Sequence, residues 1–223
     1  MVAQLRAASK TFTTNADTVV ALDAVDFDLD SGQVACVYGA SGSGKTTMLS
    51  VLAGIETLDS GTVSVDGEDF TGSSEAKRAD LRLHRVGVVF QTNNLLPEFT
   101  ALENVLLPLL VRGHRRHIAA MEARQALAAV GIEQLADRLP AQMSGGQRQR
   151  VGIARALAGE QRLLLADEPT GALDSENSKA LFELLRHRAT TDGTAIVIAT
   201  HDPIAQDYAD AVFHMVDGKV ATR

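Results

Sequence analysis

The chain has no tryptophan, one cysteine and few aromatic residues of any kind. Aromatic residues make up 4% of its 223 residues, so the aromatic platforms on which single-stranded nucleic acids stack are not expected. The single cysteine, Cys36, excludes an internal disulfide and fits a reducing compartment. Because Cys36 lies in the apolar run 34–38, we expect it to be a buried strand residue.

Long apolar segments and an excess of basic residues are also missing. No run of about 18 apolar residues is present, so no membrane span is predicted. The segment 1–6 has no hydrophobic stretch behind a basic cap, which excludes a typical signal peptide. The net charge is −7, which disfavours nucleic acid as a partner. A composition that is 45% hydrophobic and 22% charged is typical of a soluble globular protein.

The apolar pattern predicts strands that alternate with helices. Apolar and polar residues alternate over 18–22 and 25–30, which predicts half-buried antiparallel strands. Continuous apolar runs predict buried strands of the parallel type, at 34–38, 86–90, 162–167 and 195–199. A further β segment is expected at 62–67, and a closing hairpin at 212–216 and 219–221, around Asp217-Gly218. Helices are expected at 46–53 and 175–188, and most of 102–157 is expected to be helical.

These elements predict an α/β fold in a single domain, 1–223, with no internal repeat. The sheet should be mixed and mostly parallel, with helices on both faces and an antiparallel β part at the N-terminus. We expect one lobe at about 1–91 and 159–223, and an inserted helical lobe at about 92–158.

A glycine-rich loop follows the strand at 34–38 and opens a helix, which is the setting of a phosphate-binding loop. Its sequence is Gly39-Ala40-Ser41-Gly42-Ser43-Gly44-Lys45-Thr46. Glycines allow the backbone amides to approach phosphate oxygens, and the helix N-terminus adds partial positive charge. Lys45 should reach the outer phosphates, and the Thr46 hydroxyl should bind Mg²⁺. Ser43 and Thr47 are further candidate phosphate donors, and a flexible turn with an accidental lysine is the alternative.

Two acids end a second apolar strand. Leu163-Leu164-Leu165-Ala166 is followed by Asp167 and Glu168, where ligands bind in open α/β sheets. Adjacent strand residues point to opposite sides, so the two acids should have different roles. We expect Asp167 to orient Mg²⁺ through water and Glu168 to act as general base on the attacking water. Alone, the pair could equally be an acidic turn before Pro169.

A second helix N-terminus suited to phosphate lies in the middle of the chain. Ser144-Gly145-Gly146-Gln147 precedes the basic helical segment 148–157. Ser144 is a predicted N-cap, and the two glycines leave amides exposed. A nucleotide site within one chain needs only one such helix end, so the second one calls for an explanation.

From Leu5 to Val220 the chain closely resembles the ATP-binding cassette (ABC) ATPases. The resemblance implies a P-loop NTPase (RecA-like) core and a head-to-tail dimer that shares two ATP molecules, with ATP and Mg²⁺ as cofactors. In such a dimer Ser144, Gly145, Gly146 and Gln147 would face the γ-phosphate bound by the partner. By the same resemblance the loop Ala172-Leu173-Asp174 would touch the partner's site.

The resemblance also assigns individual roles. Lys45, Gln91, Glu168 and His201 would be catalytic, and His201 would contact the γ-phosphate. Thr46, Gln91 and Asp167 would hold Mg²⁺. Two positions depart from the family pattern: Met143 replaces leucine, which keeps size and apolarity. Phe12 replaces the usual tyrosine, so adenine should be held by stacking alone; the alternative is that Phe12 is a core residue.

The segments 93–105 and 166–175 resemble the branch that contains lipoprotein-releasing, macrolide-exporter and cell-division cassettes. This resemblance implies a separate permease chain, because the sequence stops at Arg223, and a peripheral, cytoplasmic position on the inner face of the membrane. The permease would dock between the lobes near 91–104, where Leu95, Leu96 and Phe99 are either contacts or core. A homodimer is the simplest form, since both sets of motifs are intact.

Three points stay open at the level of sequence. The basic cluster 112–116 is interpreted as a solvated helix start, with a lipid-headgroup contact as the alternative. A mechanical signal transducer that moves no solute is a second candidate function. A cassette ATPase acting on DNA or ribosomes is a third, disfavoured by the single cassette and the lack of a heptad run. The transported substrate is not encoded in this chain.

Overall fold

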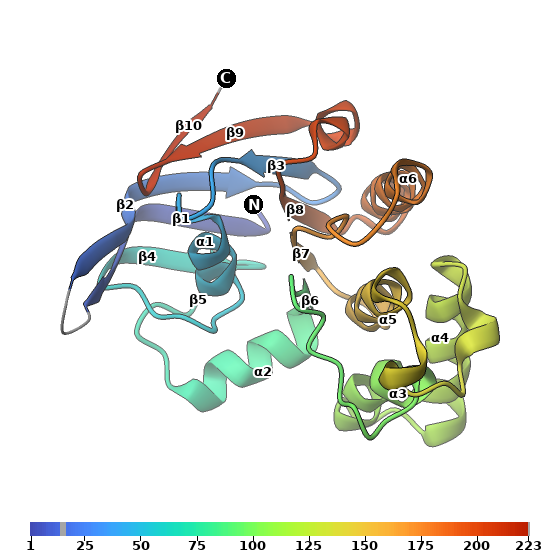
Figure 1. Ribbon diagram of the computed structural model, residues 1–223. Helices are drawn as coiled ribbons and strands as arrows, with labels where there is room; N and C mark the ends of the chain where they lie inside the picture. The colour runs from blue at the N-terminus through green and yellow to red at the C-terminus, as the bar shows by residue number, and fades with distance from the viewer. Residues whose placement is uncertain (14–16, 223) are drawn as a thin grey trace.

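The β structure forms two sheets. The computed structural model describes residues 1–13 and 17–222 (Figure 1). One sheet has four antiparallel strands in the order β2-β1-β4-β5, and the other has six in the order β10-β9-β3-β8-β7-β6. The four-stranded sheet consists of β1 (Ala3–Thr13), β2 (Thr18–Leu29), β4 (Ser60–Val65) and β5 (Glu68–Asp69).

The six-stranded sheet is parallel apart from one edge. Its strands are β3 (Val34–Tyr38), β6 (Val86–Val89), β7 (Leu163–Asp167), β8 (Ala195–Ala199), β9 (Ala211–Val216) and β10 (Lys219–Thr222). Neighbouring strands from β9 to β6 pair in parallel, and β10 pairs antiparallel with β9 as the predicted hairpin. The central strands β7 and β8 are buried along their whole length, as expected for strands covered on both faces. Cys36 on β3 is fully buried.

Helices cover both faces of this sheet. On one face α1 (Lys45–Leu52) packs against strands of both sheets and shares a hydrophobic core with them. On the other face α5 (Gly145–Leu157), α6 (Ser175–Asp192) and the 3₁₀ helix η3 (Pro203–Tyr208) share a second core. The predicted α/β class with a mostly parallel sheet and an antiparallel N-terminal part is therefore confirmed.

Three helices gather on one side of the molecule, away from β1 and β2 (Figure 1). They are α3 (Ala101–Val111), α4 (Arg116–Ala129) and α5, with the short 3₁₀ helices η1 (Glu133–Leu135) and η2 (Pro140–Gln142) between α4 and α5. They enclose a third core, in which buried alanines of α4 let the helices approach closely. This group matches the helical segment expected at 102–157, while the limits of the two lobes stay a prediction.

Several local features differ from the sequence-based expectations. The alternating runs 18–22 and 25–30 are a single strand, β2, in which Ala24 has a left-handed φ of 51°. The helix α2 (Glu75–Arg85) was not expected, because Leu81 is its one buried residue. Arg112 is not part of a solvated helix start, since it donates to the carbonyl oxygens of Leu83 and Ala158 at 2.5 and 3.2 Å. Arg115 and Arg116 are exposed, as expected.

Among the described residues, no helix combines the length and apolarity that crossing a bilayer would require.

Candidate nucleotide-binding site

A cleft of about 930 Å³ opens where the loop before α1 meets the carboxyl end of β7. It brings together residues that lie up to 189 positions apart in the chain, from Phe12 to His201. The predicted site residues that line it are Phe12, Gly39, Ala40, Ser41, Gly42, Gly44, Lys45, Thr46, Thr47, Gln91, Gly145, Asp167, Glu168, Ala172 and His201. The cleft also contains residues that the sequence did not single out, among them Val19, Asn93 and Arg148.

The loop that precedes α1 needs glycine at two positions for different reasons. Gly44 is the N-cap of α1 with a φ of 111°, and a Cβ there would lie 2.2 Å from the carbonyl oxygen of Ala21. At Gly39 a Cβ would lie 2.4 Å from the carbonyl oxygen of Met215. No side chain caps α1, so its first amides face the cleft without a side-chain acceptor, as an anion-binding helix end requires.

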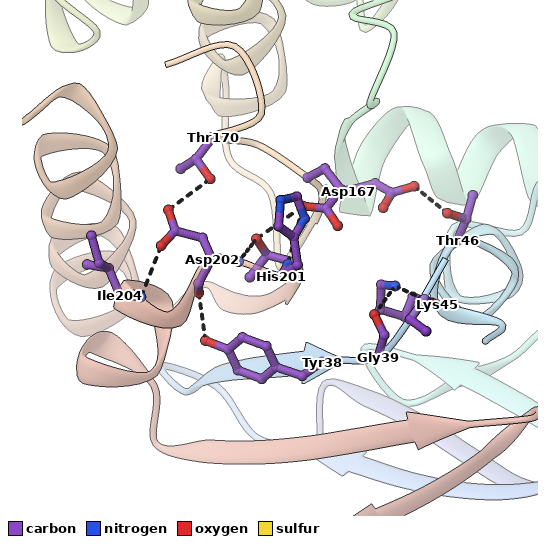
Figure 2. Close-up of polar contacts among 12 residues, drawn as sticks. Tyr38, Gly39, Lys45, Thr46, Asp167, Thr170, His201, Asp202 and Ile204 are labelled. Atoms are coloured by element: carbon purple, nitrogen blue, oxygen red, sulfur yellow. Dashed lines mark hydrogen bonds and ion pairs between the residues drawn. The ribbon is translucent and has the colours of Figure 1, made fainter. Parts of the chain in front are cut away.

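Lys45 is folded back onto the loop that it follows. Its Nζ donates to the carbonyl oxygens of Gly39 and Ala40 at 2.8 and 3.0 Å (Figure 2). The side chain is 8% exposed, so the ammonium is held inside the cleft rather than in bulk solvent. An ammonium in this place can exchange a carbonyl for a phosphate oxygen by a small rotation of its flexible stem.

Ser43 is the one residue of the predicted phosphate-binding loop that does not line the cleft. Its side chain is 6% exposed, and its Oγ has no hydrogen-bond partner among the residues that the structure describes. A buried hydroxyl without a partner is uncommon, and it marks the loop as a place where a polar ligand or a small rearrangement would supply one.

Thr46 and Asp167 form an oxygen-rich pair at the floor of the cleft. The Thr46 hydroxyl donates to Oδ2 of Asp167 at 2.7 Å (Figure 2). Burial raises the pKa of Asp167; the Thr46 hydroxyl and Lys45 oppose this shift, and the neighbouring Glu168 adds to it. A hydroxyl and a carboxylate that is poorly solvated suit a hard cation such as Mg²⁺, which binds oxygen. The residues present therefore fit the predicted Mg²⁺ site, with Gln91 in the same cleft.

Glu168 leaves the strand in an unusual backbone conformation. β7 ends at Asp167, and Glu168 has a φ of 48°, which is uncommon for a residue other than glycine. The expectation that strand alternation separates the two acids is therefore wrong as an explanation: a left-handed turn separates them, and both line the cleft. Left-handed φ values at bulky residues concentrate at functional sites.

His201 and Thr200 hold the carboxylate of Glu168. Nδ1 of His201 lies 2.9 Å from Oε2 of Glu168, and the Thr200 hydroxyl donates to the same oxygen at 3.2 Å. The His201 side chain is 80% exposed while that of Glu168 is 14% exposed. The pair thus presents one largely buried carboxylate and one accessible imidazole to the cleft.

Asp202 ties this pair to its surroundings, a role that the sequence did not indicate. Its carboxylate accepts from the Thr170 hydroxyl at 3.2 Å and from the Ile204 amide at 3.0 Å, and its carbonyl accepts from the Tyr38 hydroxyl at 3.0 Å (Figure 2). The contacts join the ends of β3, β7 and β8 next to His201. The preference of aspartate for such local caps is the only signal in the sequence.

At the far end of the cleft lies an aromatic ring. Phe12 is 38% exposed and Nζ of Lys10 lies 5.2 Å from its ring centroid. Its exposure argues against the alternative of a core residue. Val19 faces it across the β1–β2 pair and is 51% exposed in the same cleft. This pairing was not foreseen, because the partner of a strand residue depends on register.

The second helix N-terminus lines a separate cleft of about 560 Å³. Ser144, Gly146 and Gln147 lie there together with the loop Ala172-Leu173-Asp174, while Gly145 and Ala172 line both clefts. Ser144 is the N-cap of α5 as predicted: its Oγ accepts from the Gln147 amide, and the Gln147 side chain accepts from the Ser144 amide. A Cβ at Gly146 would lie 2.8 Å from the carbonyl oxygen of Ala172. Of the four residues 144–147, only Gly145 therefore lines the large cleft, followed on α5 by Arg148 and Gln149, while Ser144, Gly146 and Gln147 line only the second cleft.

Residues 22–171 match the model of the ABC transporter family. The chain belongs to the ABC transporter family. Members of the family bind and hydrolyse ATP, so the chain is an ATPase. The resemblance inferred from the sequence motifs is confirmed.

Relatives and solved structures of ABC proteins agree with this assignment. The chain is 45% identical over 199 residues to the lipoprotein-releasing system ATP-binding protein LolD of Bordetella pertussis, covering 89% of this chain and 86% of that one. It is 41% identical over 215 residues to LolD of Shewanella oneidensis, covering 96% and 94%. A dimeric, post-hydrolysis structure of the ATP-binding cassette MJ0796 bound to ADP and Pi superposes with a TM-score of 0.95 at 33% identity, covering 99% of this chain and 97% of that one.

Proposed function

We propose that this ABC ATPase works as a head-to-tail dimer in which two ATP molecules each lie between the large cleft of one chain and the second cleft of the other. The observation that carries the proposal is that Ser144, Gly146 and Gln147 line a second cleft with the loop 172–174, and not the large cleft that contains the α1 end. Because these three residues do not line the large cleft of their own chain, we infer that a partner chain supplies them there. The dimeric form of the similar cassette MJ0796 supports this arrangement.

Within this dimer the residues of the large cleft take complementary roles. The amides of residues 42–46 and the ammonium of Lys45 bind the phosphates, with Thr47 as a further donor. Phe12 stacks on the adenine, with Val19 beside it. Thr46, Gln91 and Asp167 hold Mg²⁺, and the chemistry supplied there is neutralisation of phosphate charge.

Glu168 and His201 act on the attacking water. The carboxylate of Glu168 accepts a proton from the water as the water oxygen bonds to the γ-phosphorus. The bond from that phosphorus to the oxygen bridging the β- and γ-phosphates breaks, and ADP leaves with the bridging oxygen. His201 lies against that carboxylate and, being exposed, can also touch the γ-phosphate. Hydrolysis removes the contact that joins the two chains at the γ-phosphate, so the dimer opens again after each turnover.

The partner that this cycle moves is a separate membrane protein, most consistent with a lipoprotein-releasing system. The identities to LolD of 41–45%, over more than four fifths of both chains, favour that branch. The chain would then sit on the inner face of the membrane. Leu96 and Phe99 are 39% and 37% exposed on the segment after Gln91 and offer an apolar contact to the permease, whereas Leu95 packs against the core of the helical group.

The test uses Glu168→Gln, which keeps the shape of the side chain but cannot accept the proton. Removing a general base lowers turnover by about 10²- to 10⁴-fold, so ATP should persist and hold the dimer closed. Size-exclusion chromatography with light scattering should show a monomer without nucleotide and a dimer with ATP and Mg²⁺. An unchanged monomer that still binds ATP would contradict the shared-site arrangement. ADP, which lacks the γ-phosphate, is the matched control and should leave the variant monomeric.

A further inference from the structure

An arginine on α5 holds the turn that follows Gln91. Arg155 donates to the carbonyl oxygens of Asn93 and Asn94, each at 2.7 Å. Burial lowers the pKa of its guanidinium, and in the described part of the chain no carboxylate offsets that burial. Arg155 is partly exposed, and both terminal nitrogens of its guanidinium are committed to main-chain carbonyls of this one turn.

The two carbonyls belong to a turn that the backbone does not adopt freely. Asn93 and Asn94 are consecutive residues with left-handed φ values of 61° and 44°. Asparagine tolerates this conformation better than most residues, yet two in succession still need support from outside. The amide of Asn93 bonds to Phe90, and that of Asn94 to Thr92, which closes the turn on itself. The two hydrogen bonds from the Arg155 guanidinium stabilise the turn from outside.

The surface of α5 touches the same turn at a second point. Gly152 lies three residues before Arg155, so the two share a face of the helix. A Cβ at Gly152 would lie 3.6 Å from the carbonyl oxygen of Asn93 and 3.7 Å from its Cα. The turn thus packs against α5 at Gly152 and is hydrogen-bonded to the same helix by Arg155.

α5 connects the second cleft with the turn that follows Gln91. Its N-terminus, with Ser144 and Gly146, lines the second cleft. About 16 Å further along the helix, Arg155 holds the turn two residues beyond Gln91, and Gln91 lines the large cleft with Thr46 and Asp167. A helix of 13 residues with a capped N-terminus is a rigid link between them.

We propose that Arg155 is a positioning residue that makes the turn after Gln91 move together with α5. When the N-terminus of α5 binds the ATP held by the partner chain, α5 then sets the position of Gln91 in the large cleft of its own chain. This inference rests on the proposed dimer with shared ATP. Arginine is needed because its planar guanidinium donates in parallel to two adjacent carbonyls, which a lysine ammonium cannot do in the same geometry.

The experiment compares Arg155→Lys with Arg112→Lys. Arg112 is the matched control, because it is also partly buried and also donates to two carbonyls, those of Leu83 and Ala158, but donates to no carbonyl of the turn. A merely structural role would give both variants the same loss of thermal stability and no change in turnover per folded molecule. Steady-state ATPase activity is measured against ATP and against Mg²⁺, and ATP binding is measured separately.

For Arg155→Lys we expect kcat to fall at least tenfold and the Hill coefficient for ATP to fall towards 1, while ATP affinity stays within twofold. The Mg²⁺ concentration for half-maximal activity should rise, because Gln91 is no longer held in place. Arg112→Lys should keep the wild-type values of all three. If both lysine variants share the same kcat, Hill coefficient and Mg²⁺ dependence, the inference is overturned, while an ATP-dependent dimer of Glu168→Gln leaves the proposed function standing.

A second measurement covers the case in which Arg155→Lys folds poorly. Amide hydrogen exchange of the Glu168→Gln variant, with and without ATP and Mg²⁺, reports on segments 91–95 and 144–150 in the presence of native Arg155. Coupling predicts that both segments gain protection over the same range of ATP concentration. Protection of 144–150 without any change at 91–95 would overturn the inference; failure of Glu168→Gln to dimerise would overturn it together with the proposed function.

Discussion

The N-termini of α1 and α5 are both built from glycine and serine, yet they satisfy their backbone amides in different ways. At α1 the N-cap is a left-handed glycine, and no side chain caps the helix. At α5 Ser144 and Gln147 form a reciprocal capping box. The α1 end therefore depends on a ligand to satisfy its amides, whereas the α5 end is already stable by itself. This difference suits an enzyme that binds ATP first at α1 and engages α5 only when two chains meet.

The largest effect on ATP binding should come from adding a side chain at Gly44, the N-cap of α1. In Gly44→Ala the new Cβ meets the carbonyl oxygen of Ala21 at a φ of 111°, so the loop must move. We expect ATP binding to be lost and the free energy of unfolding to fall by about 1–3 kcal/mol. Gly42→Ala is the control, because its φ is 80° but its Cβ meets nothing within 4 Å. Calorimetric titration with ATP should show binding by Gly42→Ala; equal loss in both variants would mean that backbone conformation, and not the close approach, governs the loop.

The next largest effect should follow from removing the charge at the α1 end. Hydrogen bonds to charged groups contribute about 1.5–3 kcal/mol, so Lys45→Ala should raise the Kd for ATP roughly 10- to 150-fold. Lys179→Ala, on the exposed face of α6, should leave the Kd unchanged. Fluorescence titration with a labelled ATP analogue measures both. A Kd that does not change in Lys45→Ala would remove the lysine from phosphate binding.

The α5 end should respond differently, losing turnover without losing binding. Ser144→Ala removes an N-cap, which costs about 1 kcal/mol of stability, and also removes a hydroxyl from the second cleft. We expect ATPase activity to fall roughly tenfold while a single chain still binds ATP normally. Thr100→Ala breaks the capping box of α3 and should cost similar stability with turnover kept within twofold. Equal turnover in the two variants would show that Ser144 does no more than cap its helix.

The smallest effect on ATP binding should come from Phe12, the residue proposed to stack on adenine, which lies on β1 and not on either helix. Stacking of a base on an aromatic ring contributes about 1 kcal/mol or more, so Phe12→Ala should raise the Kd for ATP roughly fivefold. Phe12→Tyr keeps the ring and should change the Kd less than twofold. Competition between ATP and GTP against each variant measures the contribution. A larger effect of Phe12→Tyr would indicate that the hydroxyl position matters and that Phe12 does more than stack.

The helix ends themselves could be predicted from the sequence, since both depend on local patterns. A strand, a glycine-rich loop and a helix are consecutive in the chain, and Ser144 with Gln147 is a capping box that can be recognised by its spacing. The buried strands β7 and β8 were predicted for the same reason, because their apolar runs are continuous. The hairpin around Asp217 also follows from two adjacent turn residues.

Features that depend on distant partners could not be predicted. α2 has a single buried residue, and Arg78 and Arg82 attach it to the carbonyl oxygen of Gly54, 24 and 28 residues away. Val19 reaches the cleft only because β1 and β2 pair in one register. The direction of the Glu168 side chain was predicted from strand alternation, but the strand ends at Asp167 and Glu168 has a left-handed backbone conformation. In each case the deciding contact is made between segments whose separation the local pattern does not encode.

The burial of Cys36 has a practical consequence. Its thiol is fully buried and donates to the carbonyl oxygen of Ala205, and burial raises its pKa to about 12. A thiol of this kind forms almost no thiolate at neutral pH and does not react with maleimides or spin labels. Because it is the single cysteine of the chain, probes attached to newly introduced surface cysteines would report from chosen positions alone. The native sequence is thus suited to labelling experiments that follow the distance between two cassettes during each catalytic cycle.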